Sequence, residues 1–371
     1  MAQVGCLGGG QLGRMLALAG RPLGLSFTFL EPQPNSSAGQ VGAQLCGAYD
    51  DPERLRELAE ASDLITFEFE SVPERAVAEL AGRRPVFPPP RALAVAQDRL
   101  EEKSLFTKLG IPHAPYAPVA VPDELAPALQ VVPPPARLKT RRLGYDGHGQ
   151  VEVDGPSALQ RAFELVGGVP SILEAEQRFS RELSILGVRS SQGELAFYPV
   201  TENHHLGSVL RLSIAPAPRV DRPLQGRAEE ICAAVMEELE YVGVIAIELF
   251  DQDGSLVANE IAPRVHNSGH WTIEGAVTSQ FENHLRAGLG WPLGETSARG
   301  PAVMLNILGQ LPPAPQVLAV PGSHLHLYGK APREGRKLGH VTVSPAEGLG
   351  DQIASLGQLP GIWVPDLVSL P

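Results

Sequence analysis

A glycine turn between a short strand and a helix, close to the start of the chain, most constrains the fold. The run Gln3–Leu7 is apolar, a G-x-G-x-x-G spacing begins at Gly8, and residues 14–19 suit a helix. The runs Leu25–Leu30 and Leu64–Phe69 predict two further strands, with helical patterns between them. Strands that alternate with helices build parallel sheets. We therefore expect a parallel α/β domain at this end of the chain.

The glycine turn has three interpretations. In dinucleotide-binding proteins, such a turn holds a pyrophosphate at the helix N-terminus, and an acidic residue that ends the next strand binds the ribose. Gly8, Gly10 and Gly13 fit that pattern, and Glu31 has the acidic position. The turn could therefore serve a nicotinamide-dependent oxidoreductase, bind a substrate phosphate, or be a plain tight turn. The sequence leaves all three open.

A second glycine-rich stretch follows Lys139. This lysine lies on a predicted strand, 136–139, and the loop after it holds three glycines within six residues before a strand over 151–153. Backbone amides of such a loop can close around phosphate oxygens, and Arg141 and Arg142 add positive charge. The stretch is not a Walker A loop. A plain hairpin with charged surface residues explains the same pattern.

Strand patterns dominate from about residue 113. The runs Glu182–Val188 and Glu194–Pro199 predict one hairpin. The runs Val244–Phe250 and Leu256–Ile261 predict another, because the Asp-Gly pair between them is a strong turn signal. Other predicted elements are a strand over residues 171–174 and helices over residues 228–239 and 281–289.

Proline clusters suggest the domain boundaries. Three prolines, Pro88–Pro90, precede a single predicted helix over Ala92–Leu109, and the proline-rich run Pro312–Pro321 predicts a linker or turn. We expect an N-terminal α/β domain over residues 1–92, a central domain over residues 93–295, and a small strand-rich domain over residues 296–371.

Composition excludes several function classes. The chain has 30 basic and 42 acidic residues, a net charge of −12, which argues against binding to nucleic acid or to an anionic membrane. Its three cysteines, Cys6, Cys46 and Cys232, show no disulfide pattern. No apolar run approaches the length of a membrane span, and the first twenty residues do not resemble a signal peptide. We predict a cytoplasmic protein that acts on small molecules.

Two glutamates on the arms of the second hairpin are metal candidates. Paired strands bring Glu248 and Glu260 close together, with Asn259 beside the second one. Mg²⁺ that bridges to nucleotide phosphates prefers such oxygen ligands. Glu248 lies within an apolar run that predicts burial, and a buried carboxylate needs a partner. An exposed hairpin with two unrelated charges is the less favoured alternative.

The segment after Glu260 is rich in polar groups that could bind an anion. His266 and His270 have the four-residue spacing of a zinc helix, but the proline and the Asn-Ser-Gly run around them favour a loop and make zinc improbable. Arg264, Asn267 and Ser268 supply hydrogen-bond donors for a phosphate or a carboxylate.

Two charged clusters have ordinary explanations on bare sequence. Glu68 and Glu70 share one face at the end of a strand, where they could accept hydrogen bonds from a substrate amine or hydroxyl, or simply face solvent. Lys330, Arg336 and Lys337 form a basic cluster of the kind that is usually a solvated surface.

In order along the chain, these motifs resemble the 5-(carboxyamino)imidazole ribonucleotide synthases of purine biosynthesis. The shared words are G-G-Q-L, T-x-E-x-E, K-T-R-R with G-Y-D-G-x-G-Q, N-E-x-A-P-R-x-H-N-S-G-H-W-T, and Y-G-K with G-R-K-x-G-H. The resemblance runs from Gly5 to about His340. It implies a three-domain ATP-grasp fold of the α/β class, and a reaction of ATP, bicarbonate and 5-aminoimidazole ribonucleotide. It also implies Mg²⁺, or alternatively Mn²⁺, and a homodimer.

The resemblance also assigns residues to sites. Catalysis would fall to Lys139, Tyr145, His148 and Arg264. The nucleotide would be bound by Arg99, Lys139, Gly144, Tyr145, Asp146, Gly147, His148, Gly149, Gln150, Glu174, Ala175, Glu176, Gln177, Glu182, His205, Asn259 and Glu260. The ribonucleotide would be bound by Gly10, Gln11, Leu12, Glu68, Arg264, His266, Asn267, Ser268, Lys330, Arg336 and Lys337. The metal would be bound by Glu248 and Glu260.

The chain departs from the family pattern at two positions of the loop after Lys139. Leu143 stands where glycine is common, and His148 stands where arginine is common. The first change predicts a stiffer loop, and the second puts an anion contact in doubt. Two other activities stay open at this point: a related formate-dependent glycinamide ribonucleotide transformylase, against which the H-N-S-G-H-W-T word argues, and a nicotinamide-dependent oxidoreductase.

Overall fold

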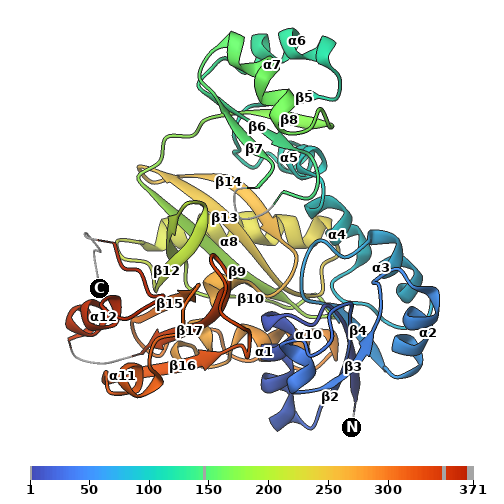
Figure 1. The fold of residues 1–371 in the computed structure, drawn as a ribbon, viewed down its shortest axis with the longest axis vertical. Coiled ribbons are helices and arrows are strands. Elements are labelled where there is room, and N and C mark those ends of the chain that lie inside the picture. The colour runs from blue at the N-terminus through green and yellow to red at the C-terminus, as the bar shows by residue number, and fades with distance from the viewer. Residues whose placement is uncertain (1, 145–147, 345–347, 366–371) are drawn as a thin grey trace.

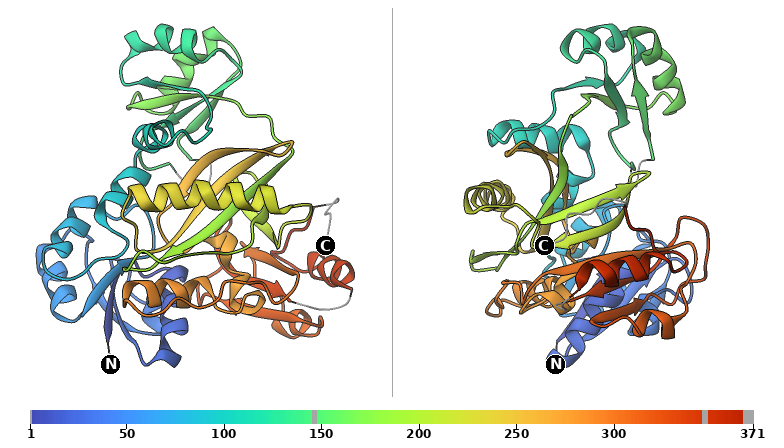
Figure 2. Two further views of the ribbon diagram at one scale, coloured as in Figure 1. Left: turned by 180° about the vertical axis from the view of Figure 1, so that it is seen from behind. Right: turned by 90° about the vertical axis from the view of Figure 1, so that its left-hand side faces the viewer.

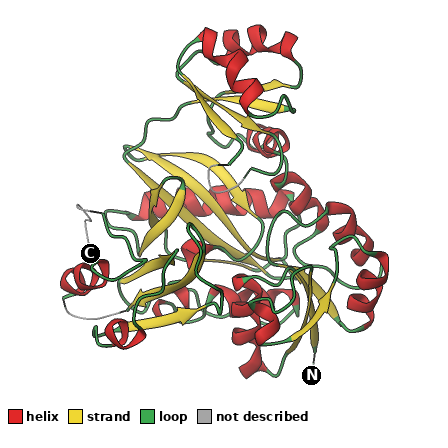
Figure 3. Cartoon of the chain, viewed as in Figure 1, coloured by secondary structure: helices red, strands yellow, loops and turns green. Residues whose placement is uncertain are grey.

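The computed structural model describes residues 2–144, 148–344 and 348–365, which form three sheets with helices packed around them (Figure 1). Figure 3 shows that the strands lie mainly inside and the helices mainly outside. Among the described residues, no helix is both long and apolar enough to cross a membrane.

The N-terminal sheet is parallel, as predicted. Its strand order is β3-β2-β1-β4, and each neighbouring pair runs parallel. Its elements are β1 (Gln3–Leu7), α1 (Gln11–Gly20), β2 (Ser26–Glu31), β3 (Ala43–Cys46), α2 (Pro52–Glu60), β4 (Leu64–Phe67) and α3 (Glu74–Ala81).

The single helix predicted over residues 92–109 is wrong, because the chain forms two helices there. These are α4 (Pro90–Ala96) and α5 (Arg99–Lys108). Asp98 lies between them with an extended backbone, and its carboxylate accepts a hydrogen bond from the amide of Leu100. A side chain that caps a new helix competes with continuation of the old one, which explains the break.

A four-stranded antiparallel sheet, order β5-β8-β6-β7, lies at the end of the molecule remote from the N-terminal sheet (Figures 1 and 2). Its elements are β5 (Tyr116–Val119), α6 (Leu125–Val131), β6 (Ala136–Thr140), β7 (Gln150–Val153), α7 (Pro156–Leu165) and β8 (Ser171–Ala175). The loop that follows Lys139 therefore joins two antiparallel neighbours, β6 and β7.

A nine-stranded sheet forms the centre, with the order β14-β13-β9-β11-β12-β15-β17-β16 and with β10 paired to β9. Both predicted hairpins are confirmed, since β9 pairs with β10 and β13 pairs with β14 in antiparallel fashion. Its strands and the helices between them are β9 (Arg181–Arg189), β10 (Leu195–Phe197), β11 (Thr201–Leu206), β12 (Val209–Ala215), α8 (Arg222–Glu238), β13 (Gly243–Gln252), β14 (Ser255–Ala262), α9 (Thr272–Gly275) and α10 (Gln280–Gly288).

The C-terminal strands extend this central sheet and form no sheet of their own. Strand β15 (Ala302–Leu308) pairs with β12 and with β17 (Lys337–Val343), and β17 pairs with β16 (Ser323–Leu327). The proline-rich run predicted as a linker contains a short helix, α11 (Ala314–Leu318), whose first turn includes a proline. The last helix is α12 (Leu349–Gly357).

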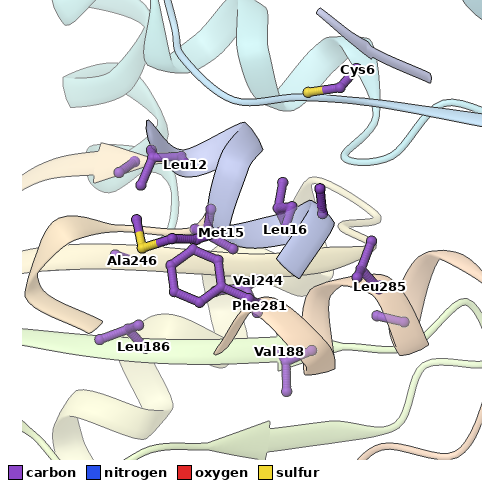
Figure 4. Packing of buried hydrophobic residues seen from close by; sticks show 14 of the residues in the cluster. Cys6, Leu12, Met15, Leu16, Leu186, Val188, Val244, Ala246, Phe281 and Leu285 are labelled. Carbon is purple, nitrogen blue, oxygen red and sulfur yellow. The ribbon is translucent and has the colours of Figure 1, made fainter. Parts of the chain in front are cut away.

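The largest hydrophobic cluster joins the N-terminal domain to the central sheet. Met15 and Leu16 of α1 lie beside Phe281 and Leu285 of α10, above β9 and β13 (Figure 4). All four side chains are buried. This packing fixes the start of α1 relative to β13, and so fixes the glycine turn relative to the carboxylate hairpin.

Candidate active site

The carboxylate of Glu68 occupies the anion-binding position at the start of α1. It accepts hydrogen bonds from the backbone amides of Gly10 at 2.7 Å and of Leu12 and Gly13 at 3.1 Å each. A side chain on Gly10 would overlap this carboxylate, and Gly8 has a φ of +102°, so both positions require glycine. Burial raises the pKa of Glu68, although the amides of Gly13 and Gly10 oppose that effect.

This arrangement argues against a dinucleotide at the glycine turn. A pyrophosphate would need the amides that Glu68 already occupies. Glu31, the predicted ribose ligand of a dinucleotide, accepts hydrogen bonds from the amide of Gly9 at 2.9 Å and the hydroxyl of Tyr49 at 2.6 Å. That Gly10, Gln11, Leu12 and Glu68 bind the ribonucleotide stays a prediction.

The C-terminal basic cluster reaches the glycine turn. The Lys330 ammonium donates to the side chain of Gln11, and it lies 5.9 Å from the centre of the Tyr328 ring. The Ser37 hydroxyl donates to the Tyr328 carbonyl at 2.6 Å, which ties the two segments together. Arg336 lies on the same loop, half-buried. Positive charge from the C-terminal part of the chain thus faces Glu68 of the N-terminal domain.

A buried ion-pair triad links α5 to the antiparallel sheet. The Glu174 carboxylate lies 2.9 Å from the Lys103 ammonium and 2.6 Å from the Lys139 ammonium. The side chains of Lys103 and Glu174 are 2% and 4% exposed. Burial alone would raise the pKa of Glu174, but the charges of Lys139 and Lys103 lower it to about 2.

The triad changes the expected role of Glu174. The backbone of Glu174 is paired on both sides, with Tyr116 of β5 and Arg137 of β6, so it has no free edge to recognise a base. Its carboxylate holds two lysines instead. Sequence reasoning missed Lys103, although it lies four residues after Arg99 on α5, and that spacing places both cations on one helix face.

The two arginines after Lys139 point away from the loop they were expected to charge. Asp98 accepts hydrogen bonds from Arg141, at 2.9 and 2.7 Å, and from Arg142 at 3.2 Å. Asp98 itself is buried. Burial would raise its pKa, but the hydrogen bond from Arg141 leads the effects that lower it. These arginines therefore anchor the base of the loop to α5.

Leu143, in the described part of the loop, has a strained backbone. Leu143 has a φ of +63° and is 78% exposed, so a leucine adopts the backbone conformation that suits glycine. Gly144, by contrast, has Arg99 and the carbonyl of His148 close to the position a side chain would take. The predicted ligands Tyr145, Asp146 and Gly147 lie outside the described residues, and His148 is exposed.

Glu248 and Glu260 face each other across the β13–β14 hairpin, as predicted. Glu248 has a side chain 15% exposed, and burial, with a further contribution from the Glu260 charge, raises its pKa to about 8. Among the described residues, no cluster of three or more acidic, histidine or cysteine side chains could hold a metal. Two carboxylates would therefore need oxygen atoms of a ligand to complete a Mg²⁺ site.

Helix α5 holds the strand that carries Glu260. The ladder between β13 and β14 is irregular beside Glu248, and the extra residue is Asn259. Its carbonyl accepts a hydrogen bond from Lys103 at 2.8 Å. The amide of Ile261, two residues further along β14, donates to the carboxylate of Glu102 at 2.6 Å. Burial raises the pKa of Glu102 to about 7. Sequence reasoning missed Glu102 too.

Four more of the expected nucleotide residues have partners within the protein. Glu182 lies 3.0 Å from Nδ1 of His205, and although burial opposes the charged ring, this hydrogen bond and the charge of Glu248 raise the pKa of His205. Gln177 folds back, and its side-chain amide donates to the carbonyl of Ala175 at 3.1 Å. Glu176 forms an exposed ion pair with Arg137 at 3.5 Å.

The segment after Glu260 places three polar side chains between the glycine turn and the hairpin. Arg264 pairs with Glu70 at 2.5 Å, and Nε2 of His266 lies 3.5 Å from Glu248. Burial and the Arg264 charge lower the pKa of His266 well below its usual range. Neither polar atom of the Asn267 side chain has a hydrogen-bond partner, although both are buried. A buried amide without a partner indicates a place for a ligand.

For this segment, the structure corrects the expectation for Ser268 and supports the one for the two histidines. Ser268 was expected to bind substrate, but it is fully buried and its hydroxyl is bonded within the protein. His266 and His270 do not share a helix, because a short turn over Asn267–Gly269 separates them, so the argument against zinc is supported. Two open cavities, of about 430 and 400 Å³, lie elsewhere, beside Gln44 and beside Ile231.

Three family models match successive parts of the chain. A ribonucleotide synthetase preATP-grasp domain matches residues 1–97, an ATP-grasp domain matches residues 104–281, and a phosphoribosylaminoimidazole carboxylase C-terminal domain matches residues 302–347.

Similar proteins cover nearly the whole chain. An N5-carboxyaminoimidazole ribonucleotide synthase from Pseudomonas aeruginosa is 51% identical over 345 residues, which are 93% of this chain and 95% of the relative. The solved synthetase from Thermus thermophilus has 51% identity and a TM-score of 0.93, and covers 99% of this chain and 100% of its own. The Aspergillus clavatus synthase, solved with ADP and 5-aminoimidazole ribonucleotide, has 33% identity, a TM-score of 0.88 and coverage of 96% and 97%.

Proposed function

The chain belongs to the N5-carboxyaminoimidazole ribonucleotide synthases, and from that premise we propose how its residues divide the substrates between two regions. It is an ATP-grasp ligase of purine biosynthesis that joins bicarbonate to the amine of 5-aminoimidazole ribonucleotide at the expense of ATP. ATP binds between the antiparallel sheet and the carboxylate hairpin. The ribonucleotide binds between the glycine turn and the C-terminal basic cluster.

One contact carries this proposal. Lys103 belongs to the buried triad with Glu174 and Lys139, and its ammonium also reaches the carbonyl of Asn259, the neighbour of Glu260. The cations suited to phosphate and the carboxylates suited to metal therefore meet at one place, where Arg99 lies 3.6 Å from Glu260. A nucleoside triphosphate with a divalent cation needs both sets of groups together.

The residues present fit Mg²⁺. Glu248 is a partly buried carboxylate, and its pKa of about 8 means that its ionised form is poorly stabilised by the protein alone. A bound cation would stabilise that ionised form. Glu260 lies opposite it and is more exposed. When bound, the metal would neutralise charge on the phosphates. The protein's own task is to hold the two carboxylates at a fixed separation, through the hairpin ladder and the contacts from α5.

The chemistry requires charge stabilisation and exclusion of water. A bicarbonate oxygen attacks the γ-phosphorus of ATP, and ADP leaves to give carboxyphosphate. Lys139 and Lys103 oppose the negative charge on the transferred group. The substrate amine then attacks the carboxyl carbon, and phosphate leaves. Carboxyphosphate is labile in water, so the loop after Lys139 must cover it until that attack. Arg264, His266 and Asn267 are placed to hold the anion.

The oxidoreductase alternative has lost its structural basis, because Glu68 fills the position that a pyrophosphate would need. The relatives described above are named as synthases, which leaves the transformylase alternative without support. Magnesium as the physiological metal, a homodimeric assembly and a cytoplasmic location stay predictions.

The assignment predicts a coupled requirement in an ADP-release assay. ADP should form at full rate only when ATP, bicarbonate and 5-aminoimidazole ribonucleotide are all present, because the anion site and the amine site are both needed for productive turnover. Product should be followed in parallel by incorporation of labelled bicarbonate. Reduction of NAD, or better turnover with glycinamide ribonucleotide and formate, would reject the assignment.

The division of substrates predicts selective effects at the basic cluster. Replacing Arg336 with Ala, or Lys330 with Met, should raise KM for the ribonucleotide by roughly tenfold or more, because each removes a charged hydrogen-bond donor to the 5′-phosphate. KM for ATP and kcat should change little, since that phosphate does not react. Arg333→Ala, an exposed change on the same loop, is the control. Equal effects on both substrates would indicate damage to the domain instead.

A further inference from the structure

Ser268 is the last member of a buried chain of hydrogen bonds that ends at His266. The chain starts at Ser213 on β12, passes through Asn203 on β11 and Ser184 on β9, and then reaches Ser268. The three serines are 0% exposed and Asn203 is 5% exposed. Four separate elements of the central sheet and its covering turn therefore contribute to one polar path.

Each step of the chain has the length of a good hydrogen bond. Ser213 Oγ lies 2.8 Å from Asn203 Oδ1, and Asn203 Nδ2 lies 2.9 Å from Ser184 Oγ. Ser184 Oγ lies 2.8 Å from Ser268 Oγ, which lies 2.8 Å from His266 Nδ1. The other ring nitrogen, Nε2, lies 3.5 Å from a carboxylate oxygen of Glu248.

A backbone amide fixes the direction of the whole chain. The amide of Ser268 lies 3.3 Å from His266 Nδ1, and a backbone amide can only donate. Nδ1 therefore accepts and carries no proton. The Ser268 hydroxyl then donates to Nδ1, so its oxygen accepts from Ser184. The hydroxyl of Ser184 is used in that bond, so its oxygen accepts from the amide group of Asn203.

The orientation of Asn203 completes the argument. With its NH₂ group toward Ser184, its oxygen faces Ser213, whose hydroxyl can donate to it. All four bonds are satisfied in this direction. In the reverse direction, Nδ1 of His266 would need a proton and would meet the amide of Ser268 donor to donor.

We propose that this chain holds His266 as the neutral tautomer with its proton on Nε2, so that the ring presents a hydrogen-bond donor to the active site. The donor faces Glu248 and, on the proposed function, an anionic oxygen of bicarbonate or carboxyphosphate. Ser268, Ser184 and Asn203 act as positioning residues for that donor. A ring in this state cannot take a proton at Nε2, so His266 is not the base for the substrate amine.

The surroundings of His266 suit a neutral donor. Arg264 lies two residues earlier and supplies full positive charge, while Asn267 supplies an amide without a protein partner. A ring that offered a lone pair at Nε2 would repel an incoming anion. A ring with a proton on Nε2 can donate to Glu248 or to the anion. The same N–H can therefore bond to Glu248 before the anion binds and to the anion afterwards.

The direct test is the tautomer itself, measured by long-range ¹H–¹⁵N correlation spectra of the protein with labelled histidine. The chain has ten histidines, and His266→Gln identifies the signal by its loss. We expect an unprotonated Nδ1 and a protonated Nε2 in the wild-type protein without substrates. A protonated Nδ1 overturns the proposal. This measurement needs no turnover, so it fails or succeeds independently of the proposed function.

The functional test is Ser268→Ala, which removes the hydroxyl donor to Nδ1 and leaves the ring less firmly oriented. We expect KM for bicarbonate to rise by roughly tenfold, the loss of one hydrogen bond to a charged group, with KM for ATP nearly unchanged. Ser190→Ala is the control, since Ser190 is also buried, at 2% exposure, and its hydroxyl accepts from amides of the β9–β10 turn. Equal rises for both substrates, or equal effects of the two variants, contradict the proposal.

Discussion

Replacing Glu174 with Gln is expected to destabilise the protein by roughly 3–5 kcal/mol, because it removes the carboxylate that pairs with both Lys103, which is buried, and Lys139, which is partly buried. The free energy of unfolding, measured by denaturant titration, is the readout. KM for ATP should rise as well, since Lys139 would no longer be held toward the phosphates. Glu152→Gln is the matched control in the same sheet: its ion pair with Arg137 is 64% exposed on the glutamate side, so its loss should cost less than about 1 kcal/mol.

The pH dependence of stability provides a second readout for the same variant. The pKa of Glu174 is lowered to about 2 from an ordinary value of 4.5. The unfolded state therefore binds the proton first as the pH falls, and the stability contributed by Glu174 is complete above pH 4.5 and is lost as the pH falls toward about 2. Glu174→Gln should lose this part of the acid sensitivity. A variant as stable as the control, with unchanged acid sensitivity, would contradict the triad.

Local signals predicted the parts of the fold that local chemistry determines. The Asp-Gly pair between β13 and β14 predicted the hairpin, and its two residues adopt the positive φ values, 52° and 92°, that such a turn requires. The hairpin register then placed Glu248 opposite Glu260, so the candidate metal pair followed from strand pairing alone. The alternation of side chains along a strand and the turn residues are sufficient to predict such hairpins, because the interacting residues are close in sequence.

Errors arose where a side chain competed with the regular pattern. One helix was predicted over residues 92–109, but Asp98 caps α5 and binds two arginines that come more than forty residues later. No short segment of the sequence contains both Asp98 and the two arginines that it binds. The same holds for Glu68, which lies 55 to 58 residues along the chain from amides that it binds. Its carboxylate takes the place where the glycine pattern predicts a phosphate.

The residues that were missed share one property, which is burial of charge. Lys103 and Glu102 occupy α5 at positions that a sequence pattern assigns to a solvated helix face, yet each is 2% exposed. Their partners, Glu174 of β8 and the backbone of β14, come from elements far away in the sequence. Only the packing of α5 against β14 shows that these charges face inward, so sequence alone could not rank them above ordinary surface residues.

Replacing Glu260 with Gln is expected to lower kcat by roughly 10²-fold or more, because one carboxylate of a two-carboxylate metal site carries a large share of the transition-state electrostatics. The activating concentration of Mg²⁺ should rise in parallel. Asp253→Asn, at the exposed tip of the same hairpin, is the control, since asparagine tolerates the positive φ there. Normal kcat with normal metal dependence in Glu260→Gln would reject the metal assignment.

The coupling between Glu248 and Glu260 makes this prediction sharper. In the wild-type protein the pKa of Glu248 is raised to about 8, first by burial and then by the charge of Glu260, so metal has to displace a proton near neutral pH. Metal affinity, measured by calorimetry in the presence of ADP, should therefore increase as the pH rises through about 8. Removing the Glu260 charge leaves burial and the Glu182 charge to raise the pKa of Glu248. The variant should bind metal more weakly at every pH, yet its affinity should reach a plateau at a lower pH than that of the wild type. Weak binding with an unshifted pH profile would mean that the two carboxylates do not share a site.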